Sequence, residues 1–253
     1  MKLKLEIPAR NRFDHLRQYG RAILMRKHRL ICGILVAGLA MPAVAGTGRD
    51  DDISRIQAAT DVFRDIVNTP ESSIPLDLLQ SAQCIAIIPS EVRFAFIFGG
   101  NYGKGLVTCR VGEKPSRNWS APAFVMIGGG SFGFQIGGAA TDLILVFRNR
   151  NGLTKLLSDK FKIGGDATAA AGPVGRHAKA GTDLQLRAQI LTYSRSRGLF
   201  AGISLNGAVF KPDQDGNVTM YGADTHSEDI LNGKMPAPHE VADLLAEITK
   251  YAL

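Results

Sequence analysis

The chain has 253 residues, 45% of them hydrophobic, and a formal net charge of +7. Residues 1–45 hold nine of the 30 Lys and Arg but only two of the 23 Asp and Glu, so the remaining residues carry 21 of each sign and are neutral. The basic character of the whole chain is therefore no evidence for nucleic-acid binding. The 208 residues after position 45 are enough for one sizeable core.

The first 45 residues have the layout of a secretory signal. A basic run at Arg26–Arg29 precedes the uncharged stretch Leu30–Met41, and Ala43–Ala45 supplies the small residues that a signal peptidase recognises. The uncharged stretch is shorter than the roughly 20 residues that a membrane-spanning helix needs.

This layout predicts a signal peptide at 1–45 and a single exported domain at 46–253. We expect the protein to be periplasmic or envelope-associated after cleavage near Ala45. An uncleaved anchor and lipidation at Cys32 are the alternatives.

The exported part begins with a predicted helix. Asp50–Asp52 would face the positive end of the helix dipole, and apolar residues recur at helical spacing over Ile53–Val67. Leu76–Gln83 predicts a second, shorter helix. The apolar run Cys84–Ile88, stopped by Pro89, predicts a strand.

The middle of the chain reads as a series of strands. Apolar residues on both faces of Phe94–Phe98 indicate a strand buried on both sides. Further strands are predicted at Phe124–Ile127, Phe132–Ile136, Leu143–Phe147, Leu184–Ile190 and Leu199–Val209. Turns are predicted at Asn149–Gly152, Ser194–Gly198 and Asp213–Asn217.

Two later helices complete the pattern: a short amphipathic helix at Leu153–Phe161 and a terminal helix with its apolar stripe at Val241–Ile248. The order of elements predicts an α+β protein, with a β-rich core of antiparallel strands and N-terminal, inserted and C-terminal helices. A sandwich and a half-barrel both fit this core. Cys84 and Cys109 lie in strand-like runs, where they would either pair or serve as small buried residues.

The uncharged stretch Trp119–Thr141 invites a transmembrane interpretation, but its six glycines disfavour a helix, and two strands around a glycine bend fit better. Gly128–Gly133 matches a dinucleotide fingerprint and, through Ser131, a nucleophile elbow. Both need a helix where the sequence alternates like a strand. The few dispersed His and Cys show no zinc spacing, and Asp213–Asn217 fits a turn better than a calcium loop. We expect no cofactor, no metal and no catalytic residue.

The charge of the exported part is unevenly distributed. Residues 93–211 hold 16 Lys and Arg against five Asp and Glu, whereas 46–92 and 212–253 are acidic. Either the acidic ends fold back onto the basic middle, or one face of the middle meets anionic partners. The basic residues beside apolar surface that we predict to contact lipid phosphates are Lys104, Arg148, Arg150, Lys155, Lys160, Lys162, Arg195 and Arg197.

Several ordered motifs resemble those of the SYLF domain, a lipid-binding module of bacteria and eukaryotes. They cover about residues 50–225 and are Gly99–Gly105, Trp119–Pro122, Gly129–Gly137, Ala170–Arg176, Tyr193–Gly202 and Tyr221–Gly222. The resemblance implies phospholipid binding without catalysis, and in eukaryotic members phosphoinositide or actin binding. Such relatives carry additional domains such as SH3 and depend on an amphipathic N-terminal helix for membrane contact.

We therefore predict a non-catalytic protein of the cell envelope that binds anionic phospholipid. An apolar, glycine-rich surface or the first helix would enter the headgroup region, and Lys and Arg would pair with phosphates. An exported protein would meet neither cytosolic actin nor much phosphoinositide, and the neutral charge of residues 46–253 gives no reason to expect a nucleic-acid partner. The alternative is a structural or protein-interaction module of the envelope. An esterase acting through Ser131 is a distant third.

Overall fold

The computed structural model describes residues 48–69, 74–95, 99–112, 118–131, 139–149, 161–175, 187–196, 199–203, 205 and 207–252. These residues belong to one compact unit, Gly46–Leu253. The predicted signal peptide lies outside the described residues.

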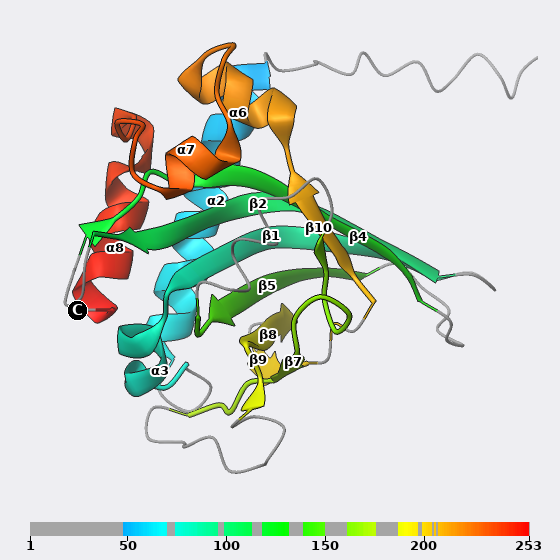
Figure 1. Ribbon diagram of the computed structural model, residues 1–253. Helices are drawn as coiled ribbons and strands as arrows, with labels where there is room; N and C mark the ends of the chain where they lie inside the picture. The colour runs from blue at the N-terminus through cyan, green and yellow to red at the C-terminus, as the bar shows by residue number, and fades with distance from the viewer. Residues whose placement is uncertain are drawn as a thin grey trace, which may run out of the picture. The chain divides into compact units, whose positions relative to one another are not determined.

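A ten-stranded sheet forms the centre of the molecule (Figure 1). Its main path runs β6-β10-β4-β2-β1-β5-β8-β7, with β3 added beside β2 and β9 beside β8. The pairs are antiparallel except for β7 with β8. The strands are β1 Cys84–Ala95, β2 Gly99–Val111, β3 Asn118–Trp119, β4 Ala123–Ser131, β5 Ala139–Phe147, β6 Phe161–Lys162, β7 Ala169–Ala171, β8 Ile190–Ser196, β9 Leu199–Gly202 and β10 Val209–Pro212.

The sheet curls until its two edges approach each other. The edge strands β6 and β7 are separated by only six residues, 163–168, and the bridge Ile163↔Ala167 lies within this connection. Because so short a segment cannot span the eight strands from β6 to β7 in an open sheet, the strands must wrap into a half-barrel. The α+β class with a half-barrel core is therefore confirmed.

Side-chain alternation along the strands divides the interior into two cores. Ile85 and Ile87 face the helices, whereas Ala86 and Ile88 face the inside of the curl. The helix-side core continues through Leu106, Phe124, Ile144 and Val146, and the inner core through Val107, Val125, Leu143, Leu145, Phe161 and Phe210. The central strands are thus buried on both faces.

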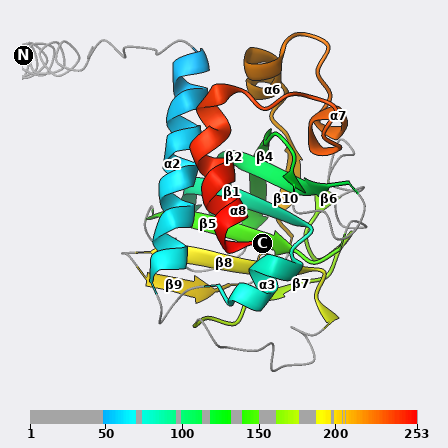
Figure 2. The same ribbon diagram turned by 90° about the vertical axis from the view of Figure 1, so that its left-hand side faces the viewer.

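Two helices lie side by side across the outer face of the sheet (Figure 2). They are α2 (Gly48–Asn68) and α8 (Ala242–Tyr251), which comes directly after the 3-10 turn η1 (His239–Val241). The helix α2 buries Ile56, Phe63 and Ile66, which recur at the predicted helical spacing. The short helices are α3 (Leu76–Ser81), α6 (Gln214–Tyr221) and α7 (Ser227–Leu231). None of the helices in the described part has both the length and the apolar character needed to cross a bilayer.

The predicted turn at Asp213–Asn217 is wrong, because these residues begin α6. The reason is a tertiary contact that local sequence does not reveal. The Asn217 amide accepts a hydrogen bond from the Phe124 backbone N at 2.7 Å and donates to the Phe124 carbonyl at 3.1 Å. This buried side chain fixes α6 against β4 and outweighs the turn preference of Asp, Gly and Asn.

Some predicted boundaries also differ from the structure. Pro89 does not end β1; the register shifts between Ile87 and Val92, and Ser90 has φ 52°, so the strand continues past an irregularity. Ser194–Ser196 belong to β8 because they pair with β5 and β9. The last two residues of that predicted turn, Arg197 and Gly198, lie outside the described residues.

Three further predictions need correction. Phe161, expected at the end of a helix, lies in β6, opposite Phe210. Of the strand predicted at Leu184–Ile190, residues 187–189 are not in a strand and β8 begins at Ile190, whereas residues 184–186 lie outside the described residues. The strand predicted at Leu199–Val209 is split into β9 and β10.

The strands predicted at Phe124–Ile127 and Leu143–Phe147 are confirmed. Those at Phe94–Phe98 and Phe132–Ile136, and the helix from Leu153, lie partly or wholly outside the described residues.

Cys84 and Cys109 form a disulfide between the start of β1 and the end of β2. They are directly opposite in the register, with their Cα atoms 4.0 Å apart, and both are fully buried. The structure thus resolves the two alternatives that the sequence left open in favour of pairing.

Replacing both cysteines, as Cys84→Ala/Cys109→Ala, should lower the free energy of unfolding by about 3 kcal/mol, because the bridge constrains a loop with a sequence separation of 25 in the unfolded chain. Urea denaturation measures this loss. The wild type under reducing conditions should fall to a similar stability, and the double variant should not respond to reductant. An unchanged wild-type midpoint after reduction would contradict the prediction.

Candidate functional site

Two rows of neighbouring residues run across β2, β4, β10 and β6 on the outer face of the sheet. The register pairs Tyr102 with Gly128, Gly128 with Val209 and Val209 with Lys162. The next row pairs Lys104 with Met126 and Met126 with Lys211. Paired residues point to the same side of a sheet, so these side chains share one surface.

We call this surface the tyrosine–lysine face; its side chains are Tyr102, Lys104, Met126, Lys162, Val209 and Lys211. Tyr102 is 46% exposed, Lys162 and Lys211 are exposed, and the other three are half-buried. In Figure 2, β4, β10 and β6 lie to one side of α2 and α8, so this part of the outer face extends past the two long helices. The result is a surface that carries one aromatic ring, two aliphatic side chains and three ammonium groups.

The next row of the same face is covered. It contains Leu106 and Phe124, both buried, and the Asp213 backbone N donates to the Phe124 carbonyl at 2.9 Å. The N-terminal ends of α2 and α6 meet here, because Arg55 from α2 also lies over the Phe124 ring. The tyrosine–lysine face therefore begins where helical cover ends.

A buried ionic network lies at this border. The Arg55 guanidinium donates to Asp52 at 2.7 Å and lies 3.5 Å from Asp213, whose same oxygen is 2.8 Å from the Lys104 ammonium. Asp213 is 1% exposed and Asp52 4% exposed. Burial is the main cause that raises the pKa of Asp52, and the Asp213 charge adds to it, whereas Arg55 and Lys104 oppose it.

The predicted lipid-contacting residues occupy several places. Lys104 and Lys162, distant in sequence, both lie on the tyrosine–lysine face. Arg148 lies elsewhere, just beyond the end of β5. Arg195 contacts carboxylates of the protein itself. The remaining four, Arg150, Lys155, Lys160 and Arg197, lie outside the described residues.

Arg195 ties α2 to the sheet. Its Nε donates to Asp142 on β5 at 2.6 Å, and its Nη1 pairs with Asp65 on α2. Its guanidinium also lies over the Phe200 ring, 5.5 Å from the centroid. These contacts give Arg195 a structural role within the described part of the chain, and its charge is largely balanced there.

Tyr102 and Lys211 were not among the predicted site residues. Tyr102 belongs to a glycine-rich motif that the sequence had highlighted, but an exposed tyrosine cannot be distinguished there from a buried one. Lys211 comes after an alternating run whose apolar residue Phe210 is buried, so alternation alone places the lysine on the opposite, outer side. The alternation of buried and exposed residues was therefore the sequence signal that could have identified Lys211 as a surface residue.

Ser131 is the last residue of β4 and pairs with Gly99 on β2. The bend predicted between the strands Phe124–Ile127 and Phe132–Ile136 is wrong for Gly128–Ser131, because these residues continue β4. The next segment, 132–138, lies outside the described residues.

Comparisons with known proteins point to one family. Residues 128–251 match the family model Ysc84, described as Las17-binding protein actin regulator. The chain is 33% identical over 178 residues to SH3 domain-containing YSC84-like protein 1 of Rattus norvegicus and of Homo sapiens, which is 70% of this chain and 51% of each relative. It is 31% identical over 175 residues to LAS seventeen-binding protein 3 of Saccharomyces cerevisiae, covering 68% and 37%. The chain spans about half the length of the mammalian relatives it matches.

The ionic network predicts a pH-dependent effect of Asp52→Asn. Because burial raises the pKa of Asp52 in the folded state, its protonated form is favoured there, and its contribution to stability is complete below the ordinary value of 3.8 and is lost as pH rises through the raised pKa. The asparagine variant should therefore gain stability relative to the wild type as the pH rises above about 4. Urea denaturation at constant ionic strength tests this. A difference that moves in favour of the wild type with rising pH would mean that Arg55 and Lys104 outweigh burial.

Proposed function

The chain belongs to the SYLF family, whose model is named Ysc84, and from this premise we propose that it is a non-catalytic phospholipid-binding protein of the cell envelope. The observation that carries the proposal is the tyrosine–lysine face. Its three lysines and one exposed tyrosine form a single surface at the edge of the helical cover.

The chemistry of the tyrosine–lysine face suits a bilayer surface. A tyrosine at the headgroup level has its ring toward the acyl chains and its hydroxyl toward water, and lysines reach phosphates on flexible stems. Each lysine near an anionic surface contributes about 1 kcal/mol. Lys104 contributes less than Lys211, because Asp213 lies 2.8 Å from the Lys104 ammonium.

The proposal assigns no membrane contact to the apolar stripe of α2. Ile56, Phe63 and Ile66 are 0–1% exposed because they form part of the helix-side core. Exposing them would cost about 1.5–3 kcal/mol for each side chain. Contact through the sheet needs no such rearrangement.

We also propose that the chain is exported and that residues 1–45 are removed. The Cys84–Cys109 disulfide supports this, because buried structural disulfides are typical of oxidising compartments and rare in the cytosol. If residues 1–45 are removed, their excess of Lys and Arg does not contribute to the charge of the functional protein.

A protein partner is the second candidate. The observation that favours it is the printed description of the family as Las17-binding and the name LAS seventeen-binding protein 3 of one relative. These names describe binding or regulation rather than a catalysed reaction. An apolar and basic surface such as the tyrosine–lysine face would also fit an acidic protein, so vesicle binding is the measurement that separates the two candidates.

The double variant Lys162→Gln/Lys211→Gln should bind vesicles containing an anionic phospholipid about 30-fold more weakly than the wild type, since two lysines contribute about 2 kcal/mol. Vesicle flotation at increasing salt measures this, and binding should also weaken with salt because exposed charges are screened over about 10 Å at 0.1 M. Binding to neutral vesicles should be unchanged.

The matched control is Lys234→Gln/Lys250→Gln, which removes the same charge from α8 and the loop after α7. This control should bind anionic vesicles nearly as well as the wild type. Equal weakening of both double variants would assign the attraction to net charge. No binding by the wild type would leave the protein-partner candidate in place of the lipid proposal.

The mature N-terminus should be Gly46, because Ala43–Ala45 ends the predicted signal. N-terminal analysis and intact mass of the protein isolated from the envelope fraction measure this. A full-length cytoplasmic species as the only form would refute the export proposal.

A further inference from the structure

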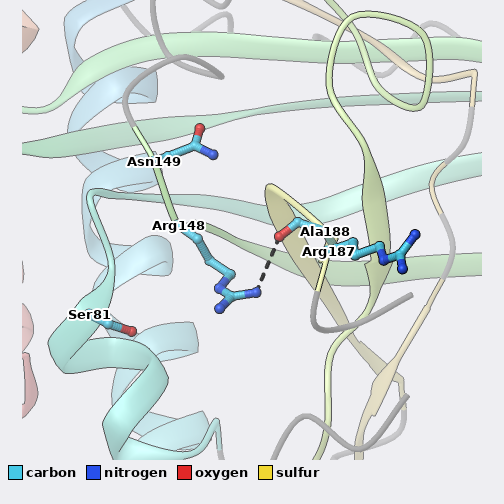
Figure 3. A pocket seen from close by; sticks show the side chains of 5 residues that line it. All are labelled: Ser81, Arg148, Asn149, Arg187 and Ala188. Carbon is cyan, nitrogen blue, oxygen red and sulfur yellow. Dashed lines mark hydrogen bonds between the residues drawn. The ribbon is translucent and has the colours of Figure 1, made fainter. Parts of the chain in front are cut away.

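A polar pocket lies where three connections converge beyond the ends of the strands (Figure 3). Its volume is about 310 Å³. Its lining comes from the end of α3, the residues after β5 and the residues before β8: Ser81, Arg148, Asn149, Arg187 and Ala188. Such a volume is at the lower end of the range typical for small-molecule sites.

The frame of this pocket is rigid because it continues the hydrogen bonding of the sheet. Gln83 N donates to the Phe147 carbonyl at 2.7 Å, and Arg148 N donates to the Gln189 carbonyl at 2.9 Å. Thr168 completes the frame by donating to the Arg187 carbonyl at 3.3 Å. The neighbouring disulfide closes the same end of β1 and β2. The lining backbone is therefore held in place before any ligand binds.

The pocket offers donors and positive charge. The half-buried Arg148 extends into it and donates to the Ala188 carbonyl at 3.4 Å, at the long end of hydrogen-bond distances (Figure 3). Arg187 stands on the rim, exposed, and in Figure 3 its guanidinium extends away from Arg148, so its long stem must rotate to reach a bound group. Asn149 and Ser81 add an amide and a hydroxyl. Among the described lining residues there is no carboxylate.

We propose that this pocket binds a phosphate ester, a compact phosphate group on a small polar body. Arginine remains charged at every relevant pH, and its planar fork matches two phosphate oxygens. Asn149 would donate to a remaining oxygen, the Ser81 hydroxyl would do so by rotating away from the Leu78 carbonyl, to which it donates at 3.2 Å, and the volume admits a group such as glycerol phosphate.

The pocket is distinct from the tyrosine–lysine face. Tyr102 is near the start of β2 and Cys109 near its end, so the two sites are separated by about 23 Å along this strand. The phosphate ester could reach the pocket as a soluble molecule or as a lipid headgroup. The chemistry recognised is the same in both cases, and the experiment separates the sources.

The test is calorimetric titration of the purified, disulfide-bonded protein with glycerol 3-phosphate, and in parallel with vesicles containing phosphatidic acid. Arg148→Gln and Arg187→Gln should each weaken binding roughly tenfold, as expected for a lost charged hydrogen bond. Arg148→Lys should fall between Arg148→Gln and the wild type, because it keeps the charge and loses the fork. Arg187→Gln keeps the test valid if the half-buried Arg148 is needed for folding.

The matched control is Lys162→Gln/Lys211→Gln, which should retain full affinity for glycerol 3-phosphate. Arginine-dependent binding of the soluble ester identifies a soluble ligand, and arginine-dependent binding of phosphatidic acid alone identifies a headgroup. Both results support the site. The proposal is overturned if the wild type shows no saturable binding to either, or if the arginine variants bind as the wild type does. Failure of the tyrosine–lysine face to bind anionic vesicles would leave the result with glycerol 3-phosphate unaffected.

Discussion

Burial of the central strands on both faces is the constraint on which the rest of this structure depends. Residues Cys84–Ile88 of β1 are 0–1% exposed, because even and odd positions face different cores. A closely packed interior has no room for a ligand, and small volume changes there are costly. Surfaces available to a partner must therefore lie where a core ends. The tyrosine–lysine face lies where α2 and α8 no longer cover the sheet, and the polar pocket that contains Arg148 and Arg187 lies beyond the ends of the strands.

The same constraint determines the role of α2. Its apolar stripe completes the helix-side core, and its two ends are joined to the sheet by charged groups. Arg55 connects it to Asp213 near one end, and Asp65 pairs with Arg195 near the other. The Arg55–Asp213 pair is buried, and removing one partner of a buried ion pair leaves an uncompensated charge, which costs more than the pair contributes. In this chain the first helix is consequently an integral part of the fold.

The sequence predicted the helices and strands far better than it predicted which of them lie next to each other in space. The helical spacing of Ile56, Phe63 and Ile66 and the apolar run from Cys84 are local patterns, and the structure has the expected helix and strand there. The helix α6 was mispredicted because Asn217 is held by Phe124, which is 93 residues away. Register explains why the tyrosine–lysine face was only partly predicted. Tyr102, Lys162 and Lys211 become neighbours through the pairing of four strands, and no local pattern contains that pairing.

Charge distribution along the chain explains which basic residues can serve a partner. The acidic segments on either side of the basic middle do fold back onto it. Asp65 comes from the first acidic segment and pairs with Arg195, and Asp213 from the last pairs with Lys104. Each such pair neutralises one positive charge of residues 93–211. The excess of basic residues in this segment is therefore larger than the positive charge that a partner would contact. Lys162 and Lys211 remain exposed because β6 is the edge strand and β10 lies next to it, where neither α2 nor α8 covers them. Position in the sheet, rather than density of charge in the sequence, therefore decides where an anionic partner would bind.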